Sequence, residues 1–142
     1  MAIIESNGFA HVRLTVTDIK RSKAFYDELF GWPVAVDSSD EVDEPGVRES
    51  QKKFYGGTVY QTPQGTLFGL RPVGNETFDP DSTGLDHVSF AVADRDALVD
   101  AAEKLAAADI VHGEVTDLTD AGMAILSFQD PDDINIELTA PL

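Results

Sequence analysis

Two short segments of the chain alternate apolar and polar residues and have closely similar sequences. The first covers residues 11–18 and the second residues 87–94. An apolar residue at every second position is typical of a strand with one buried face. These apolar residues are Val12, Leu14 and Val16 in the first segment and Val88, Phe90 and Val92 in the second. The similarity predicts two related halves, with His11 and His87 pointing away from the buried faces.

A helix is predicted after each of these strands. In the first half, Asp18 is a suitable N-cap and Gly31 a suitable end for a helix with an aromatic stripe. In the second half, Asp94 is the N-cap, and Leu98 and Leu105 belong to the apolar face. Further strands are predicted near residues 54–55, 58–61, 66–71, 113–118, 122–128 and 134–139.

The order strand, helix, strand, strand, strand therefore occurs twice. The predicted fold class is α+β, with two βαβββ modules. We place the first module at about residues 8–72, a linker that contains Gly74, Pro80 and Gly84 at 73–84, and the second module at 85–142. A chain of 142 residues is long enough to form one domain with a real core.

The net charge of the chain limits the kinds of molecule that it is expected to bind. Its 26 acidic and 10 basic residues give a formal net charge of −16. A field of this sign repels phosphate backbones and anionic lipids, so we expect neither nucleic-acid nor membrane binding. Solubility, adaptation to high salt and attraction of a cationic ligand all remain open as reasons for the charge. The acidic stretch 37–49 is expected to be a solvated loop, with a lid over the ligand as the alternative.

The chain has no cysteine, so a metal ion would be held by histidine and carboxylate groups. No apolar run reaches the roughly 18 residues of a membrane helix, and the first residues do not resemble a secretory signal. A cytoplasmic location is the simplest expectation.

Several motifs together resemble a known superfamily. They are the 11–18 segment, Phe25-Tyr26, Phe30-Gly31, Asp86-His87-Val88, Asp130-Pro131-Asp132 and Ile136-Glu137-Leu138. This set is similar to the vicinal oxygen chelate superfamily, which includes glyoxalase I, extradiol dioxygenases, fosfomycin-modifying enzymes and bleomycin-resistance proteins. The resemblance implies curved mixed sheets around a cleft, a small-molecule ligand and a homodimer.

The resemblance also implies a metal site. Members of the superfamily take ligands from the first and last strands of each module, which here gives His11, His87 and Glu137. The fourth position falls on Gly69, which has no ligand to offer. The residue types also predict a metal site, because two imidazoles and one carboxylate at polar strand positions would form a facial triad. Such a triad is suited to Fe(II) or Mn(II), with Zn(II) or Ni(II) as alternatives. Open coordination positions favour oxygenation or metal-assisted addition over glyoxalase-type isomerisation.

Other residues are candidates for the cleft. Arg71 lies two residues after Gly69 and is expected to point to the same face of the strand. It either pairs with an anionic substrate group or is an exposed arginine at the strand end. Glu137 and Arg71 are thus the expected catalytic residues. Further polar candidates are Arg13, Thr15, Ser89, Ser127 and Asn135. Phe54, Tyr55 and Tyr60 form either an aromatic wall or part of the core.

Three functions follow from these observations. The first is a metal-dependent enzyme of dioxygenase-like, lyase or transferase type, which acts on a small oxygen-bearing substrate. The second is a metal-free binding protein of the bleomycin-resistance type that sequesters a cationic antibiotic, which the acidic charge favours. The third is an accessory protein that kept the fold and lost the chemistry.

Overall fold

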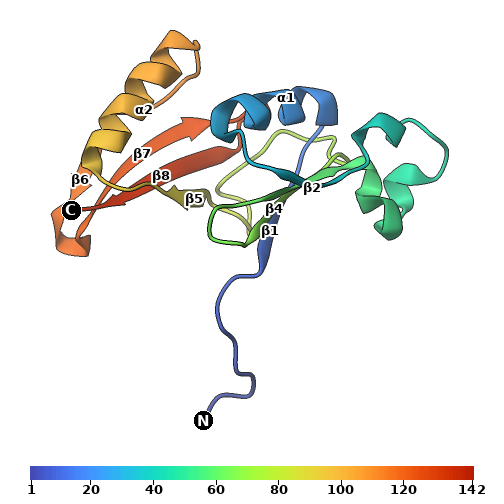
Figure 1. Ribbon diagram of the computed structural model, residues 1–142, viewed down its shortest axis with the longest axis horizontal. Helices are drawn as coiled ribbons and strands as arrows, with labels where there is room; N and C mark the ends of the chain where they lie inside the picture. The colour runs from blue at the N-terminus through green and yellow to red at the C-terminus, as the bar shows by residue number, and fades with distance from the viewer. The chain divides into compact units, whose positions relative to one another are not determined.

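The structure is a computed structural model that describes all 142 residues. The chain divides into two compact units, Met1–Glu76 and Thr77–Leu142. Each unit has one four-stranded mixed sheet and one α-helix, in the order βαβββ (Figure 1). The predicted α+β class and its two βαβββ modules are confirmed.

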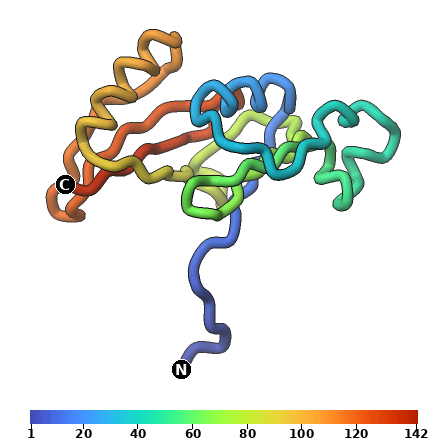
Figure 2. The backbone as a smooth tube through the Cα atoms, in the orientation of Figure 1, coloured from blue at the N-terminus to red at the C-terminus, as the bar shows by residue number.

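The first unit begins with residues 1–10, which form neither helix nor strand and lead into the first strand (Figure 2). Its main elements are β1 (His11–Thr15), α1 (Ile19–Phe30), β2 (Val34–Asp37), β3 (Thr58–Gln61) and β4 (Leu67–Arg71). The strand order across the sheet is β1-β4-β3-β2. The pair β1 and β4 is parallel, and the other pairs are antiparallel. The first and last strands of the unit are therefore neighbours.

The helix α1 begins and ends where the sequence predicts. The Asp18 carboxylate accepts a hydrogen bond from the Arg21 backbone N–H at 3.2 Å. Gly31 follows the helix with a φ of 59°, a left-handed conformation that glycine adopts without strain. Tyr26 packs edge-on against Phe68 of β4, with ring centroids 5.0 Å apart. The helix therefore covers the sheet face that carries Phe68.

The second unit repeats this plan. Its main elements are β5 (Val88–Ala91), α2 (Arg95–Ala107), β6 (Thr116–Leu118), β7 (Met123–Gln129) and β8 (Asn135–Pro141). The strand order is β5-β8-β7-β6, with β5 and β8 parallel. Asp94 caps α2 by accepting a hydrogen bond from the Ala97 N–H at 2.9 Å, and the helix packs on β7 and β8. No helix in the structure has the length and apolarity needed to cross a membrane.

The segment between β2 and β3 differs from its prediction. It contains the short 3-10 helices η1 (Ser39–Glu41), η2 (Val47–Glu49) and η3 (Gln51–Gly56). The expected solvated loop is therefore partly folded, with Val42 and Val47 buried. The strand predicted for Phe54 and Tyr55 is wrong, because both residues have a left-handed backbone, with φ of 51° and 58°. Such a backbone cannot continue a strand.

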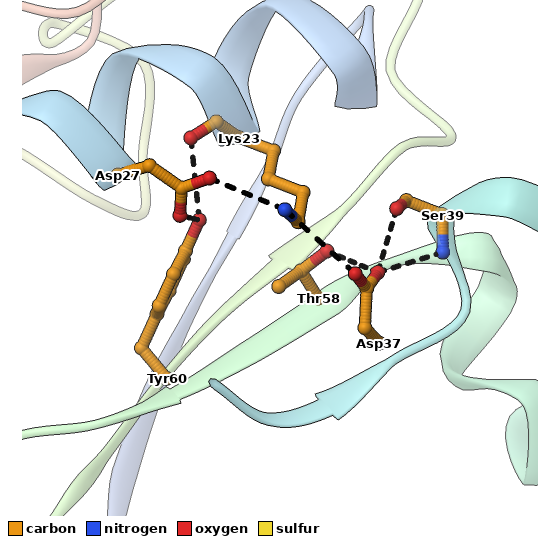
Figure 3. A network of polar contacts seen from close by, with 6 residues as sticks. All are labelled: Lys23, Asp27, Asp37, Ser39, Thr58 and Tyr60. Atoms are coloured by element: carbon orange, nitrogen blue, oxygen red, sulfur yellow. Dashed lines mark hydrogen bonds and ion pairs between the residues drawn. The ribbon is translucent and has the colours of Figure 1, made fainter. Parts of the chain in front are cut away.

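A polar network joins α1 to the sheet beneath it (Figure 3). Lys23 Nζ lies 3.2 Å from Asp27 Oδ2 and 3.8 Å from Asp37 Oδ2. The Tyr60 hydroxyl donates to Asp27 Oδ1 at 2.8 Å, and Tyr60 is only 1% exposed. Of the two expectations for Tyr60, the core position is confirmed and the aromatic wall is wrong.

The network also changes how its members titrate. Burial raises the pKa of Tyr60, and the hydrogen bond to Asp27 raises it further. The hydrogen bond to Asp27 raises the pKa of Lys23. Burial opposes ionisation of Asp37, but hydrogen bonds from Ser39 and Thr58 and the charge of Lys23 leave the pKa of Asp37 lowered. The native state thus favours a neutral phenol and a charged lysine between two carboxylates.

We expect Tyr60→Phe to lower the free energy of unfolding by about 1 kcal/mol at neutral pH, because one hydrogen bond to Asp27 is lost. In the native protein, the raised pKa of Tyr60 keeps the phenol protonated above about pH 10, where the unfolded chain ionises its tyrosines. The free energy of unfolding therefore falls as the pH rises through this range. The fall should be shallower in Tyr60→Phe.

Urea unfolding of both proteins from neutral pH to about pH 11 measures this difference. Tyr55→Phe is the matched control, since it removes a hydroxyl and leaves the network of Figure 3 intact. Parallel alkaline profiles for the wild type and Tyr60→Phe would contradict the role given to Tyr60.

Candidate functional site

The sheet face of the second unit opposite its buried core carries polar side chains. On β8, Ile136 and Leu138 are buried, whereas Glu137 and Thr139 alternate with them and are half-buried. Ser89 of β5 pairs with Glu137 in the parallel register. Since aligned residues of paired strands share a face, these polar side chains meet on one side of the sheet.

His87 and Glu137 face each other on this side. His87 lies one residue before β5, and its Nε2 is 3.6 Å from Glu137 Oε1. Its other ring nitrogen, Nδ1, is 2.6 Å from the Asp86 carboxylate. In a neutral ring, the Nδ1 proton is donated to Asp86, so the lone pair of Nε2 points to the Glu137 side. The side chains predicted to act together in this unit are therefore neighbours.

Two hydroxyl groups fix the Glu137 carboxylate. Thr139 Oγ1 donates to Glu137 Oε1 at 3.1 Å. Ser89 Oγ lies 2.5 Å from Thr139 Oγ1. Because Thr139 has a single hydroxyl proton, which it gives to Glu137, Ser89 is the donor in the second bond. The chain of bonds from Ser89 through Thr139 orients Glu137.

The spacing of His87 and Glu137 is close to that of two ligands on one divalent metal ion. Two ligands that each lie about 2.1 Å from one ion are roughly 3 to 3.5 Å apart, and the 3.6 Å between His87 Nε2 and Glu137 Oε1 is close to that range. A carboxylate on the second nitrogen of a ligating histidine is the usual outer partner at metal sites. Asp86 has that place, although sequence reasoning gave it no role.

The first unit differs at the equivalent position. Arg13 of β1 pairs with Gly69 of β4, just as Ser89 pairs with Glu137. The structure thus puts Gly69 at the position that corresponds to Glu137, as predicted. A Cβ atom on Gly69 would lie 3.2 Å from Arg13 Cγ. The stem of Arg13 therefore uses the room that a ligand side chain at residue 69 would need.

Arg71 and Arg13 both lie against the ring of Tyr55. The Arg71 Cζ atom is 4.1 Å from the ring centroid, and the Arg13 Cζ atom is 5.8 Å from it. Tyr55 is half-buried rather than part of the buried core, and its ring contacts these two arginines. His11 is exposed and shares the Arg13 face of β1, because side chains two residues apart point to the same side.

The predicted site residues are thus distributed over both units. His87 and Glu137 lie together in the second unit, and His11 and Arg71 belong to the first. No group of three or more histidine or acidic side chains in the structure is arranged to hold a metal ion. The three-ligand site stays a prediction. Sequence reasoning did not assign roles to Asp86 or Thr139, although their positions beside His87 and two residues after Glu137 were visible in the sequence.

Residues 8–138 match the model of the Glyoxalase/Bleomycin resistance protein/Dioxygenase superfamily. The chain belongs to this superfamily. The match includes His11, His87 and Glu137, and it confirms the resemblance to the vicinal oxygen chelate proteins. No curated protein matches the chain.

Solved structures of the superfamily have the same fold. A glyoxylase/bleomycin resistance protein/dioxygenase domain from Frankia sp. EAN1pec is 27% identical, with a TM-score of 0.76 over 97% of this chain and 94% of that one. A glyoxalase/dioxygenase from Nostoc punctiforme is 22% identical, with a TM-score of 0.67 over 100% and 98%. A mutant of the fosfomycin resistance protein FosX from Listeria monocytogenes, complexed with Mn(II) and 1S,2S-dihydroxypropylphosphonic acid, is 16% identical, with a TM-score of 0.72 over 97% and 95%.

The contact between Gly69 and Arg13 gives a prediction about stability. We expect Gly69→Ala to lower the free energy of unfolding by roughly 1 kcal/mol more in the wild type than in an Arg13→Ala background. The added methyl group presses on Arg13 Cγ only when that atom is present. Chemical denaturation of the four proteins of this double-mutant cycle measures the coupling. Additive effects would show that Arg13 does not use the space beside Gly69.

Proposed function

We propose that the protein is a divalent-metal-dependent enzyme that acts on a small oxygen-bearing organic substrate. Its chemistry is dioxygenase-like or that of a related lyase or transferase. The observation that supports this proposal is the pair formed by His87 Nε2 and Glu137 Oε1, 3.6 Å apart, each fixed by its own partner. An imidazole and a carboxylate held in this way can supply two of the ligands of a metal site.

In this proposal, His11 of the first unit is the third ligand. Two histidines and one carboxylate are typical of Fe(II) sites, and Mn(II) takes similar ligands. The FosX structure, which has the same fold, contains Mn(II). When bound, the ion would supply Lewis-acid polarisation of a substrate oxygen.

The residues of the chain have separate tasks. Asp86 holds the His87 ring in the tautomer that leaves Nε2 free for a ligand bond. Thr139 engages one oxygen of Glu137 and so limits the rotation of the carboxylate. Gly69 supplies no fourth ligand, so a bound ion would keep coordination positions open for substrate oxygens. These features favour chemistry that requires direct binding of the substrate.

The net charge of −16 favours a second candidate function. A metal-free binding protein of the bleomycin-resistance type would attract a cationic antibiotic through its acidic surface. The two proposals differ in what a chelator does. A cationic antibiotic bound by a sequestering protein stays bound after chelator treatment, whereas the substrate of a metal enzyme loses its contacts with the ion.

We expect chelator-treated wild-type protein to bind Mn(II), and His87→Ala to weaken that binding by about a hundredfold, because one ligand is removed. Asp86→Asn should weaken it by about tenfold to a hundredfold, since the histidine loses its charged partner. Electron paramagnetic resonance of the free Mn(II) during a titration measures both affinities.

His112→Ala is the matched control. His112 is a histidine of the same unit whose Nδ1 lies 2.6 Å from the Gly113 carbonyl oxygen rather than beside a carboxylate. Its replacement should leave the Mn(II) affinity unchanged. Equal Mn(II) binding by the wild type, His87→Ala and His112→Ala would refute the metal site.

A further inference from the structure

Two guanidinium groups from neighbouring strands converge on one aromatic ring in the first unit. Arg13 comes from β1 and Arg71 from β4, and their Cζ atoms lie 5.8 and 4.1 Å from the centroid of the Tyr55 ring. One arginine stacked on a tyrosine is ordinary packing. Two like charges at the same ring repel each other, and nothing in ordinary packing requires this.

Acidic side chains are plentiful in this protein, and several of its basic side chains pair with them. Ion pairs with aspartate or glutamate are made by Lys23, Arg48, Lys53, Arg95 and Lys104. Arg13 and Arg71 form no ion pair, although the chain has 26 acidic residues. Arg71 Nε is also buried and without a hydrogen-bond partner. A buried N–H donor is costly to leave without a hydrogen-bond partner.

The backbone that presents Tyr55 is strained. Phe54 and Tyr55 have left-handed conformations in succession, and Gly56 follows with a φ of 80°. Non-glycine residues rarely adopt this conformation, and such strain is concentrated at ligand-binding sites. The Tyr55 N–H donates to the Ser50 carbonyl oxygen at 2.9 Å, which closes the turn.

Close packing fixes this turn beside β4. A Cβ atom on Gly57 would lie only 1.9 Å from the Leu70 carbonyl oxygen, so residue 57 has to be glycine. Leu70 is the residue before Arg71. The close approach of Gly57 to β4 therefore carries the Tyr55 ring to the Arg71 guanidinium, and the strained turn serves this contact.

We propose that Arg13, Arg71 and Tyr55 bind the anionic group of the substrate, a carboxylate or phosphonate. Guanidinium groups bind such oxyanions through paired N–H donors, and an anion shared by both would relieve their mutual repulsion. The missing side chain of Gly69 gives Arg13 the room to reach toward β4. The substrate is thus a small organic anion rather than a cation.

This site deepens the proposed function and rests on it for its role. His11, the proposed third ligand, lies on the same face of β1 as Arg13, two residues earlier, which is about 7 Å along the strand. A substrate held by its anionic group at Arg13 would keep its reactive oxygens close to His11. Anion binding itself requires only residues of the first unit and no metal ion.

The test uses the full-length, chelator-treated protein, titrated with methylphosphonate and followed by amide shifts in NMR spectra. We expect saturable binding that is weakened roughly tenfold or more by Arg13→Met and by Arg71→Met, with shifts centred on β1, β4 and Tyr55. Arg71→Lys keeps the charge and should retain part of the affinity. Acetate as a second probe distinguishes a carboxylate site from a phosphonate site.

Arg95→Met is the matched control, because Arg95 pairs with Asp117 in the second unit. It should bind methylphosphonate as the wild type does. Unchanged affinity in Arg13→Met and Arg71→Met that retain native amide spectra would overturn the proposal, as would the absence of saturable binding of either probe. Mn(II) binding without anion binding would refute the anion site alone. Anion binding without Mn(II) binding would refute the metal enzyme and support the anion site.

Discussion

The parallel pairing of the first and last strands in each unit is the constraint on which the candidate site depends. It sets Ser89 beside Glu137 in the second unit and Arg13 beside Gly69 in the first. Because side chains alternate along a strand, a shift of one residue would turn Glu137 into the core and expose Ile136. Ile136 is fully buried, so the apolar face holds the register that the polar face needs.

At matching positions of the paired strands, the two units have different side chains. The second unit combines an imidazole, a carboxylate and two hydroxyl groups, each with a defined hydrogen-bond partner. The first unit replaces the carboxylate by glycine and fills the space with the stem of Arg13. The two candidate metal ligands that lie together therefore belong to the second unit, and the two arginines belong to the first. In a chain with a net charge of −16, Arg13 and Arg71 form no ion pair and share the ring of Tyr55.

Much of the fold follows from short-range patterns that the sequence displays directly. The alternation around His11 and His87 predicts β1 and β5, and Asp18, Gly31 and Asp94 predict where the helices begin or end. These features depend on neighbouring residues, so a single sequence is sufficient to find them. The equivalence of Gly69 and Glu137 also follows, because the repeat carries it from one unit to the other.

The remaining features depend on contacts between distant residues. The left-handed turn at Phe54 and Tyr55 exists because Gly57 packs against Leu70, and aromatic residues in such a segment otherwise suggest a strand. The burial of Tyr60 depends on Asp27 of α1, which accepts its hydroxyl. The hydrogen bond from Thr139 to Glu137 depends on side-chain rotamers, which the alternation of residues along a strand does not determine. Sequence therefore indicated the polar face and not the bonds that organise it.

In the proposed enzyme, His87 Nε2 and Glu137 bind one metal ion. The most direct measurement is anomalous scattering from crystals of the full-length protein grown with Mn(II). We expect a single strong peak at coordination distance from both His87 Nε2 and the Glu137 carboxylate, with His87 Nδ1 still hydrogen-bonded to Asp86. A peak bound to other residues, or His87 and Glu137 in contact with each other in the presence of Mn(II) and no peak between them, would contradict it.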